Sequence, residues 1–178
     1  ITVTNGGKLT IADTDTLNWS GGNNISVLNG TMEMGTKRLS LNNVSINLTD
    51  AIVSGTGDGS NGAFDYIENA RGTLTASGNS TVEGTIRLRG NAVITFNVDG
   101  EGSLLNVGTY NNGGQIIKTG AGTLAVVNGA SGNITVNDGV LSFTESATFT
   151  GTATVNSGAT IDLAQTGDNV AFAGTIEG

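Results

Sequence analysis

Residues 116–143 read IIKTGAGTLAVVNGASGNITVNDGVLSF, and this stretch decides the fold class. Ile134 and Val136 come before a turn at 137–139, and Leu141 and Phe143 follow it. Because side chains alternate between the two faces of a strand, apolar residues two apart share one face. The turn consists of Asn, Asp and Gly, which tolerate a positive φ angle. The stretch therefore predicts two short strands joined by a tight corner.

The same unit recurs along the chain. In each copy an apolar pair, a polar turn and a second apolar pair follow one another. Three copies share one spacing: Ile25 and Val27 with Met32 and Met34; Leu39 and Leu41 with Ile46 and Leu48; Ile134 and Val136 with Leu141 and Phe143. Two further copies, after Val3 and after Val155, have one extra residue in the turn. From Leu88 onward the second pairs recur with a period close to nineteen residues.

A fixed period near twenty with Gly and Asn corners is typical of a parallel β-helix, in which each coil pairs with its neighbours. We expect an all-β chain with a single domain over 1–178 and about eight or nine coils. The absence of Pro agrees, since Pro cannot donate a hydrogen bond to a strand ladder. The structural alternative is a meander or sandwich of β-hairpins, which uses the same turn residues.

Composition excludes several functions. The chain has no His and no Cys, so it cannot build a Ser-His-Asp triad, a Cys nucleophile or the usual zinc site. A net charge of −8 disfavours nucleic acid as a partner. No apolar run is long enough to cross a membrane as a helix. We expect no enzyme activity, no catalytic residue, no metal and no cofactor.

The phrase around Lys118, Gly120, Gly122, Thr123 and Leu124, continued by Val136, Gly139, Leu141 and Phe143, resembles the autotransporter-associated β-strand repeat of Gram-negative bacteria. A weaker copy runs over 71–88. The resemblance implies a right-handed parallel β-helix that is part of a larger passenger domain. It also implies export across the outer membrane, display on the cell surface or release, and a translocator barrel outside this chain as the only link to the membrane.

An irregular stretch over 54–71 interrupts the repeat, and we interpret it as a loop insertion. It carries the candidate ligand-binding residues, because loops on a regular scaffold often hold binding residues. The candidates are three acids and two aromatic residues: Asp58, Phe64, Asp65, Tyr66 and Glu68. Their carboxylates would suit Ca²⁺, but the spacing matches no calcium motif. The alternative is a purely structural loop.

Two further features have competing interpretations. Asp13 and Asp15 form a carboxylate pair of the kind that glycosidases use, or an ordinary solvated corner. Trp19 either packs on the core or contacts a sugar.

The sequence predicts a structural and adhesive segment that binds a host-cell or matrix component, or neighbouring cells through self-association. A role in passenger folding during secretion is a further possibility. The alternatives are a β-helical polysaccharide hydrolase or lyase and a segment of a phage or surface fibre.

Overall fold

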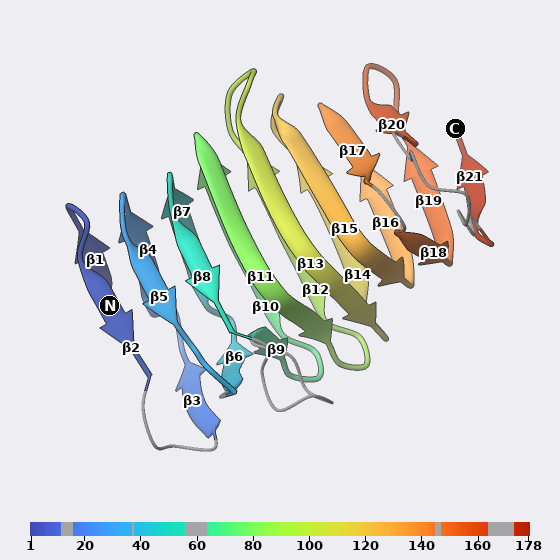
Figure 1. Cartoon of the computed structure of the whole chain (residues 1–178). Helices are drawn as coiled ribbons and strands as arrows, with labels where there is room; N and C mark the ends of the chain where they lie inside the picture. Colours follow the sequence, from blue (N-terminus) through green and yellow to red (C-terminus); the bar gives the residue numbers. More distant parts are fainter. Residues whose placement is uncertain (12–15, 37, 56–63, 145–146, 164–172) are drawn as a thin grey trace.

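A computed structural model describes residues 1–11, 16–36, 38–55, 64–144, 147–163 and 173–178. The described residues contain 21 β-strands and no helix, and every strand ladder is parallel. Successive coils stack side by side along one axis (Figure 1). The chain is therefore a parallel β-solenoid, as the repeat predicts. No helix among these residues is long and apolar enough to span a membrane.

One strand from nearly every coil forms the first sheet, which has nine strands. Seven steps separate β1 from β19 in this sheet, so the solenoid has about seven full turns. The strands are β1 (Thr2–Thr4), β4 (Asn24–Leu28), β7 (Ser45–Thr49), β10 (Arg71–Ser77), β12 (Val93–Val98), β14 (Gln115–Thr119), β16 (Asn133–Val136), β19 (Thr152–Val155) and β21 (Thr175–Glu177).

The second sheet lies across the core from the first. Its main path is β2 (Lys8–Thr10), β5 (Thr31–Glu33), β8 (Ile52–Ser54), β11 (Asn79–Leu88), β13 (Leu104–Asn112), β15 (Thr123–Ser131), β17 (Val140–Phe143) and β20 (Thr160–Asp162). The register shifts within β11 between Val82 and Thr85, and within β13 between Val107 and Thr109. Such irregularities bend a strand, and beyond them the long strands continue onto a third side of the coil.

We call this third side the side strip. It consists of β3 (Thr16–Ser20), β6 (Arg38–Asn42), β9 (Phe64–Tyr66), β18 (Thr148–Thr150) and the C-terminal parts of β11, β13 and β15. Two expectations change here. Leu39 and Leu41 lie in the side strip, so their unit turns a different corner from the unit of Ile25 and Val27. In the expected insertion over 54–71, residues 64–66 form strand β9 rather than loop, and residues 56–63 lie outside the described part.

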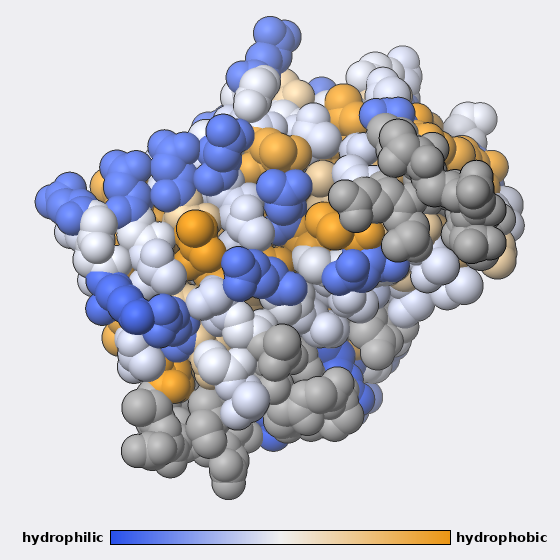
Figure 2. Space-filling model, viewed as in Figure 1, coloured by the Kyte–Doolittle hydropathy of each residue, from blue (hydrophilic) through white to orange (hydrophobic). Residues whose placement is uncertain are grey.

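Inward-facing side chains from the three sides form one core, in which apolar residues of one coil stack on apolar residues of the next. Val3 pairs with Val27 and Val27 with Leu48, while Leu124 pairs with Leu141. All the apolar pairs of the three equally spaced repeat units are buried, as predicted. Exposed large apolar side chains are scattered along the chain. In the view of Figure 2, hydrophobic residues likewise gather only in small groups among hydrophilic ones.

Left-handed residues make the corners. Asn5, Asn29, Asp50 and Gly78 have φ angles of 56°, 47°, 45° and 59° and follow strands that pair with one another in register. Short polar side chains and Gly accept this conformation, whereas other residues are strained in it. Gly120 and Gly139 also have positive φ, at 78° and 66°. The predicted corner role is confirmed at Asn5, Asn29, Gly120 and Gly139, and the structure adds corners at Asp50 and Gly78.

Candidate functional site

The residues predicted to bind a ligand do not form an open surface in the described part of the chain. Phe64, Asp65 and Tyr66 lie together in β9, and each has 0% of its surface exposed. Phe64 and Tyr66 belong to the core cluster. Glu68 is exposed in the corner that follows. Asp58, like Asp13 and Asp15, lies outside the described residues.

Asp65 is held by arginines from the two neighbouring coils, Arg38 in β6 and Arg89 directly after β11. Arg89 donates from Nε to Oδ1 over 2.9 Å and from Nη2 to Oδ2, in a two-pronged contact. The Nη1 atom of Arg38 lies 3.6 Å from Oδ2. Such fork-like contacts fix a carboxylate strongly. Asp65 therefore fastens three coils of the side strip together, which supports the structural interpretation of this residue.

Tyr66 and Trp19 also have packing roles. The Tyr66 hydroxyl is buried without a hydrogen-bond partner among the described residues, and burial raises the pKa of Tyr66 above its ordinary value of 10.0. Trp19 is half-buried, packs against the core and pairs with Leu41. The Tyr66 ring is fully buried and cannot stack on a sugar, whereas Trp19 packs against the core with part of its surface exposed.

Lys118 is a buried cation whose role sequence reasoning missed. It points inward from β14, between Phe96 and Val136 in register, and is 0% exposed. Its Nζ atom donates to the carbonyl oxygens of Thr119, Gly120 and Asp138 at 2.9, 2.6 and 3.0 Å. All three ammonium hydrogens are thus used to join two adjacent corners. Burial lowers the pKa of Lys118 to about 8, against the opposing effect of the Asp138 charge. Two signals in the sequence pointed to it: Lys118 stands two residues after an inward Ile, and it belongs to the repeat phrase at 118–124.

The outward side of the first sheet carries a regular set of short polar side chains, which we call the polar lattice. Parallel strands lie about 4.8 Å apart and alternate residues about 6.7 Å apart, so these side chains form rows in two directions. Neighbouring coils are bonded through them: Thr119 donates to Asn97 over 3.2 Å and Asn156 donates to Asn137 over 2.7 Å. The polar lattice comprises Ser26, Asn47, Thr73, Thr75, Thr95, Asn97, Thr119, Thr135, Asn137, Thr154 and Asn156.

Charge is nearly absent from this side. In the nine first-sheet strands the charged residues are Arg71, Lys118 and Glu177, and Lys118 points into the core. Arg71 lies in a different outward row, with Val93 and Gln115, and Glu177 follows Thr154 in register at the C-terminal end of the polar lattice. The second sheet and side strip, by contrast, carry outward charges in several strands, such as Lys8 paired with Glu33 at 2.6 Å. The polar lattice is therefore a neutral surface on a chain of net charge −8.

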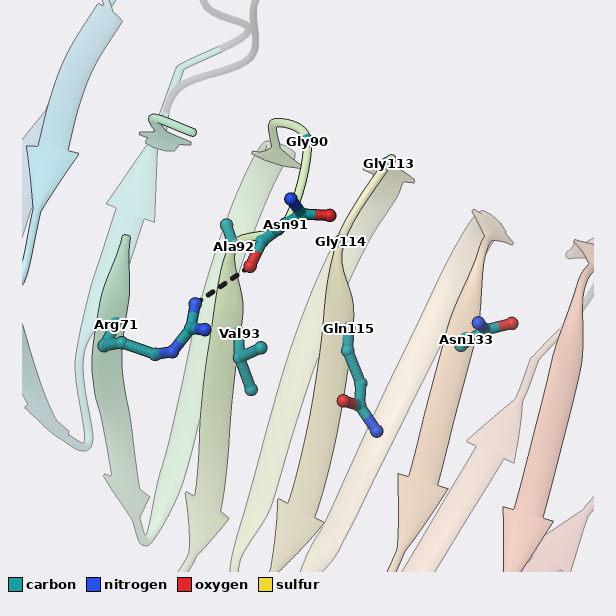
Figure 3. Close-up of a pocket in the computed structure, with 9 residues that line it drawn as sticks. All are labelled: Arg71, Gly90, Asn91, Ala92, Val93, Gly113, Gly114, Gln115 and Asn133. Carbon is teal, nitrogen blue, oxygen red and sulfur yellow. Dashed lines mark hydrogen bonds between the residues drawn. The ribbon is translucent and has the colours of Figure 1, made fainter. Parts of the chain in front are cut away.

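A groove of about 400 Å³ borders the polar lattice at the corners that lead into β10, β12, β14 and β16 (Figure 3). Arg71, Val93, Gln115 and Asn133 follow one another in register along it. Its other lining residues are Gly90, Asn91, Ala92, Gly113 and Gly114. Three glycines leave the corner without side chains, so polar groups surround an open hollow.

No group of three His, Cys, Asp or Glu residues in the described ranges is arranged to hold a metal ion. The polar lattice and the groove are two features through which the described residues can contact other molecules. Comparisons of the chain with protein-family models, with curated proteins and with solved structures find no match.

Proposed function

We propose that the chain is a structural and adhesive segment of a surface-displayed, exported passenger, and that it adheres by pairing its polar lattice with the lattice of a second copy. The observation that carries the proposal is the neutral outward side of the first sheet. The β-solenoid supplies the rigid scaffold, since each coil is fixed by backbone ladders on both sides.

The chemistry of the polar lattice is self-complementary. Hydroxyl groups of Ser and Thr and the amide of Asn each both donate and accept hydrogen bonds. A surface of this kind can pair with an identical surface through a two-fold axis, in which each patch meets its own copy. Many weak contacts in two regular rows then add up over the length of the sheet.

The distribution of charge explains why two copies would associate through the outward side of the first sheet rather than through another side. Two copies that each carry −8 repel one another, which keeps most of their surfaces apart. The polar lattice adds no charge of its own, so the approach of two lattices has the smallest local repulsion. Self-association should consequently strengthen as salt screens the remaining net charge.

A matched pair of double variants tests this proposal. Thr95 and Thr135 flank Ile117 in one row of the first sheet, and Thr31 and Thr81 flank Ile52 in one row of the second sheet. The test variant T95E/T135E places like charges in the polar lattice, while the control T31E/T81E adds the same charge to the other side.

Sedimentation velocity of the purified chain and settling of cells that display it measure the outcome. We expect T95E/T135E to abolish self-association and settling, and T31E/T81E to leave both close to those of the original chain. Equal loss in both variants, or a chain that stays monomeric at all concentrations, contradicts the proposal. Retained adhesion to host matrix without self-association would assign the adhesive role to a different partner.

A further inference from the structure

The groove of Figure 3 has a built cationic end. The Nη1 atom of Arg71 donates to the carbonyl oxygen of Asn91 at 2.8 Å and to that of Ala70 at 3.1 Å. A longer contact of 3.4 Å reaches the carbonyl of Asn69. These bonds hold one side of the guanidinium against the corner backbone, which fixes its plane before any ligand arrives.

The other side of the guanidinium remains available. Nε and Nη2 of Arg71 have no hydrogen-bond or ion-pair partner among the described residues, and Arg71 is exposed to solvent. These two nitrogens form the edge that binds both oxygens of a carboxylate in a two-pronged contact. Of the described residues that line the groove, Arg71 alone carries a charge.

Amide side chains continue the groove away from Arg71. Gln115 donates one N–H to Thr135 over 3.2 Å, which steadies its side chain and leaves its oxygen and second N–H for a ligand. Asn91 and Asn133 add further amides. Amide groups that both donate and accept suit the hydroxyl groups of a sugar. A volume of about 400 Å³ lies in the range of small-ligand sites.

We infer that this groove binds an acidic sugar residue, with the sugar carboxylate on Nε and Nη2 of Arg71 and its hydroxyls on Gln115, Asn91 and Asn133. The Glu68 carboxylate lies close to Gly90, with its Oε1 3.2 Å from the position that a Cβ atom would occupy there. Because this charge repels any carboxylate, a ligand with a single acidic group held by Arg71 suits the site better than a ligand with several. The inference is tested apart from self-association: Gln115 touches the polar lattice at Thr135, but R71Q and G113T change no residue of the lattice.

Backbone NMR of the ¹⁵N-labelled chain, titrated with sodium glucuronate, tests the inference. We expect saturable shifts of the amide signals of residues 90–92 and 113–115. Glucose and sodium acetate are the two controls, since the first lacks the carboxylate and the second lacks the hydroxyls. Both should bind at least about tenfold more weakly than glucuronate, because each loses one of the two sets of hydrogen bonds.

Three variants locate the site. R71Q should weaken glucuronate binding by about tenfold or more, and R71K should recover only part of it because Lys lacks the planar fork. G113T narrows the hollow without changing charge. The nearest atom to a Cβ at Gly113 is the Gly90 nitrogen at 3.3 Å, so the corner has to shift by a few tenths of an ångström to take the side chain. G113T should abolish binding even if R71Q disturbs the corner.

Several results would overturn the inference. One is the absence of any saturable shift with glucuronate. Another is binding of glucuronate to R71Q and G113T that is as strong as its binding to the original chain. A third is binding of acetate or glucose that equals the binding of glucuronate. If acetate binds as tightly as glucuronate, the groove is an unselective anion site. If glucose binds as tightly as glucuronate, Arg71 does not bind the sugar carboxylate. Because titrations use dilute monomeric chain, their failure leaves the self-association test unaffected, and the reverse also holds.

Discussion

At the scale of single residues, Lys118 and Asp65 show how this solenoid buries charged side chains. Asp65 could be recognised in the sequence as an unusual acid, yet its burial depends on arginines 24 and 27 positions away along the chain. Lys118 was visible as part of a repeat motif, but a sequence does not reveal that three corner carbonyls converge on one point. The roles of Asp65 and Lys118 depend on contacts between coils, and these contacts cannot be inferred from the residues next to them in the sequence.

Stability should depend on pH through Lys118. Its pKa is about 8 in the folded chain against an ordinary 10.5, so between these values the unfolded chain binds the proton that the folded chain has released. The free energy of unfolding must then rise with pH from about 8 toward 10.5. Above pH 10 the raised pKa of Tyr66 acts in the opposite direction, because only the unfolded chain ionises there. Urea unfolding followed by circular dichroism across this window measures the slope.

The variant K118M supplies the control for this dependence. Met fits an inward position but leaves the carbonyls of Thr119, Gly120 and Asp138 without their donor. We expect it to lower the free energy of unfolding at neutral pH by about 1–3 kcal/mol and to lose the rise above pH 8. A rise that persists in K118M would show that another group causes it.

At the scale of elements, the corners could be predicted because their chemistry is local. Asn, Asp and Gly stand where the chain needs a left-handed residue, and alternating apolar residues mark the buried side of each strand. The side strip could not be separated from the sheets in the same way. Its unit at 39–48 has the same spacing as the unit at 25–34, so two different corners of the coil look alike in sequence.

Coil length was predictable only in part. Residues bonded between neighbouring coils are 18 apart at Val126 and Thr144 but 29 apart at Asp50 and Asn79. The expected period near nineteen therefore suits the later coils and fails where longer corners intervene. Strand β9 lies in such a region, and only its pairing with β6 and β11 identifies it as a strand. The groove was missed because it arises where two glycine-bearing corners, at Gly90 and at Gly113–Gly114, lie side by side in space.

Substitutions at two corners should rank by backbone geometry. Asn29 is exposed with a φ of 47°, so N29G should change stability by less than about 0.5 kcal/mol and N29A should cost about 1–2 kcal/mol. Gly139 has a φ of 66°, and a Cβ there would also collide with the carbonyl oxygens of Gly120 and Gly122. G139A should therefore cost more than N29A. Thermal unfolding of the three variants tests this order, and equal costs for N29A and G139A would refute it.

At the scale of the whole molecule, the different sides of the solenoid have different structural and functional roles. The core and the corners hold the coils, the side strip buries an ion-pair cluster, and the first sheet turns a neutral polar lattice outward. This separation follows from the repeat, because a residue type placed at one position of each coil becomes a continuous row. The adhesive role proposed for the polar lattice depends on this row extending over many coils.

The most direct measurement uses the absence of cysteine from the chain. T95C places one thiol in the middle of the polar lattice, and N106C places one at an outward position of the second sheet. Under mild oxidation of the displayed or purified chain, we predict disulfide-linked dimers for T95C and almost none for N106C. Equal cross-linking of the two variants, or cross-linking of N106C alone, would contradict self-association through the first sheet.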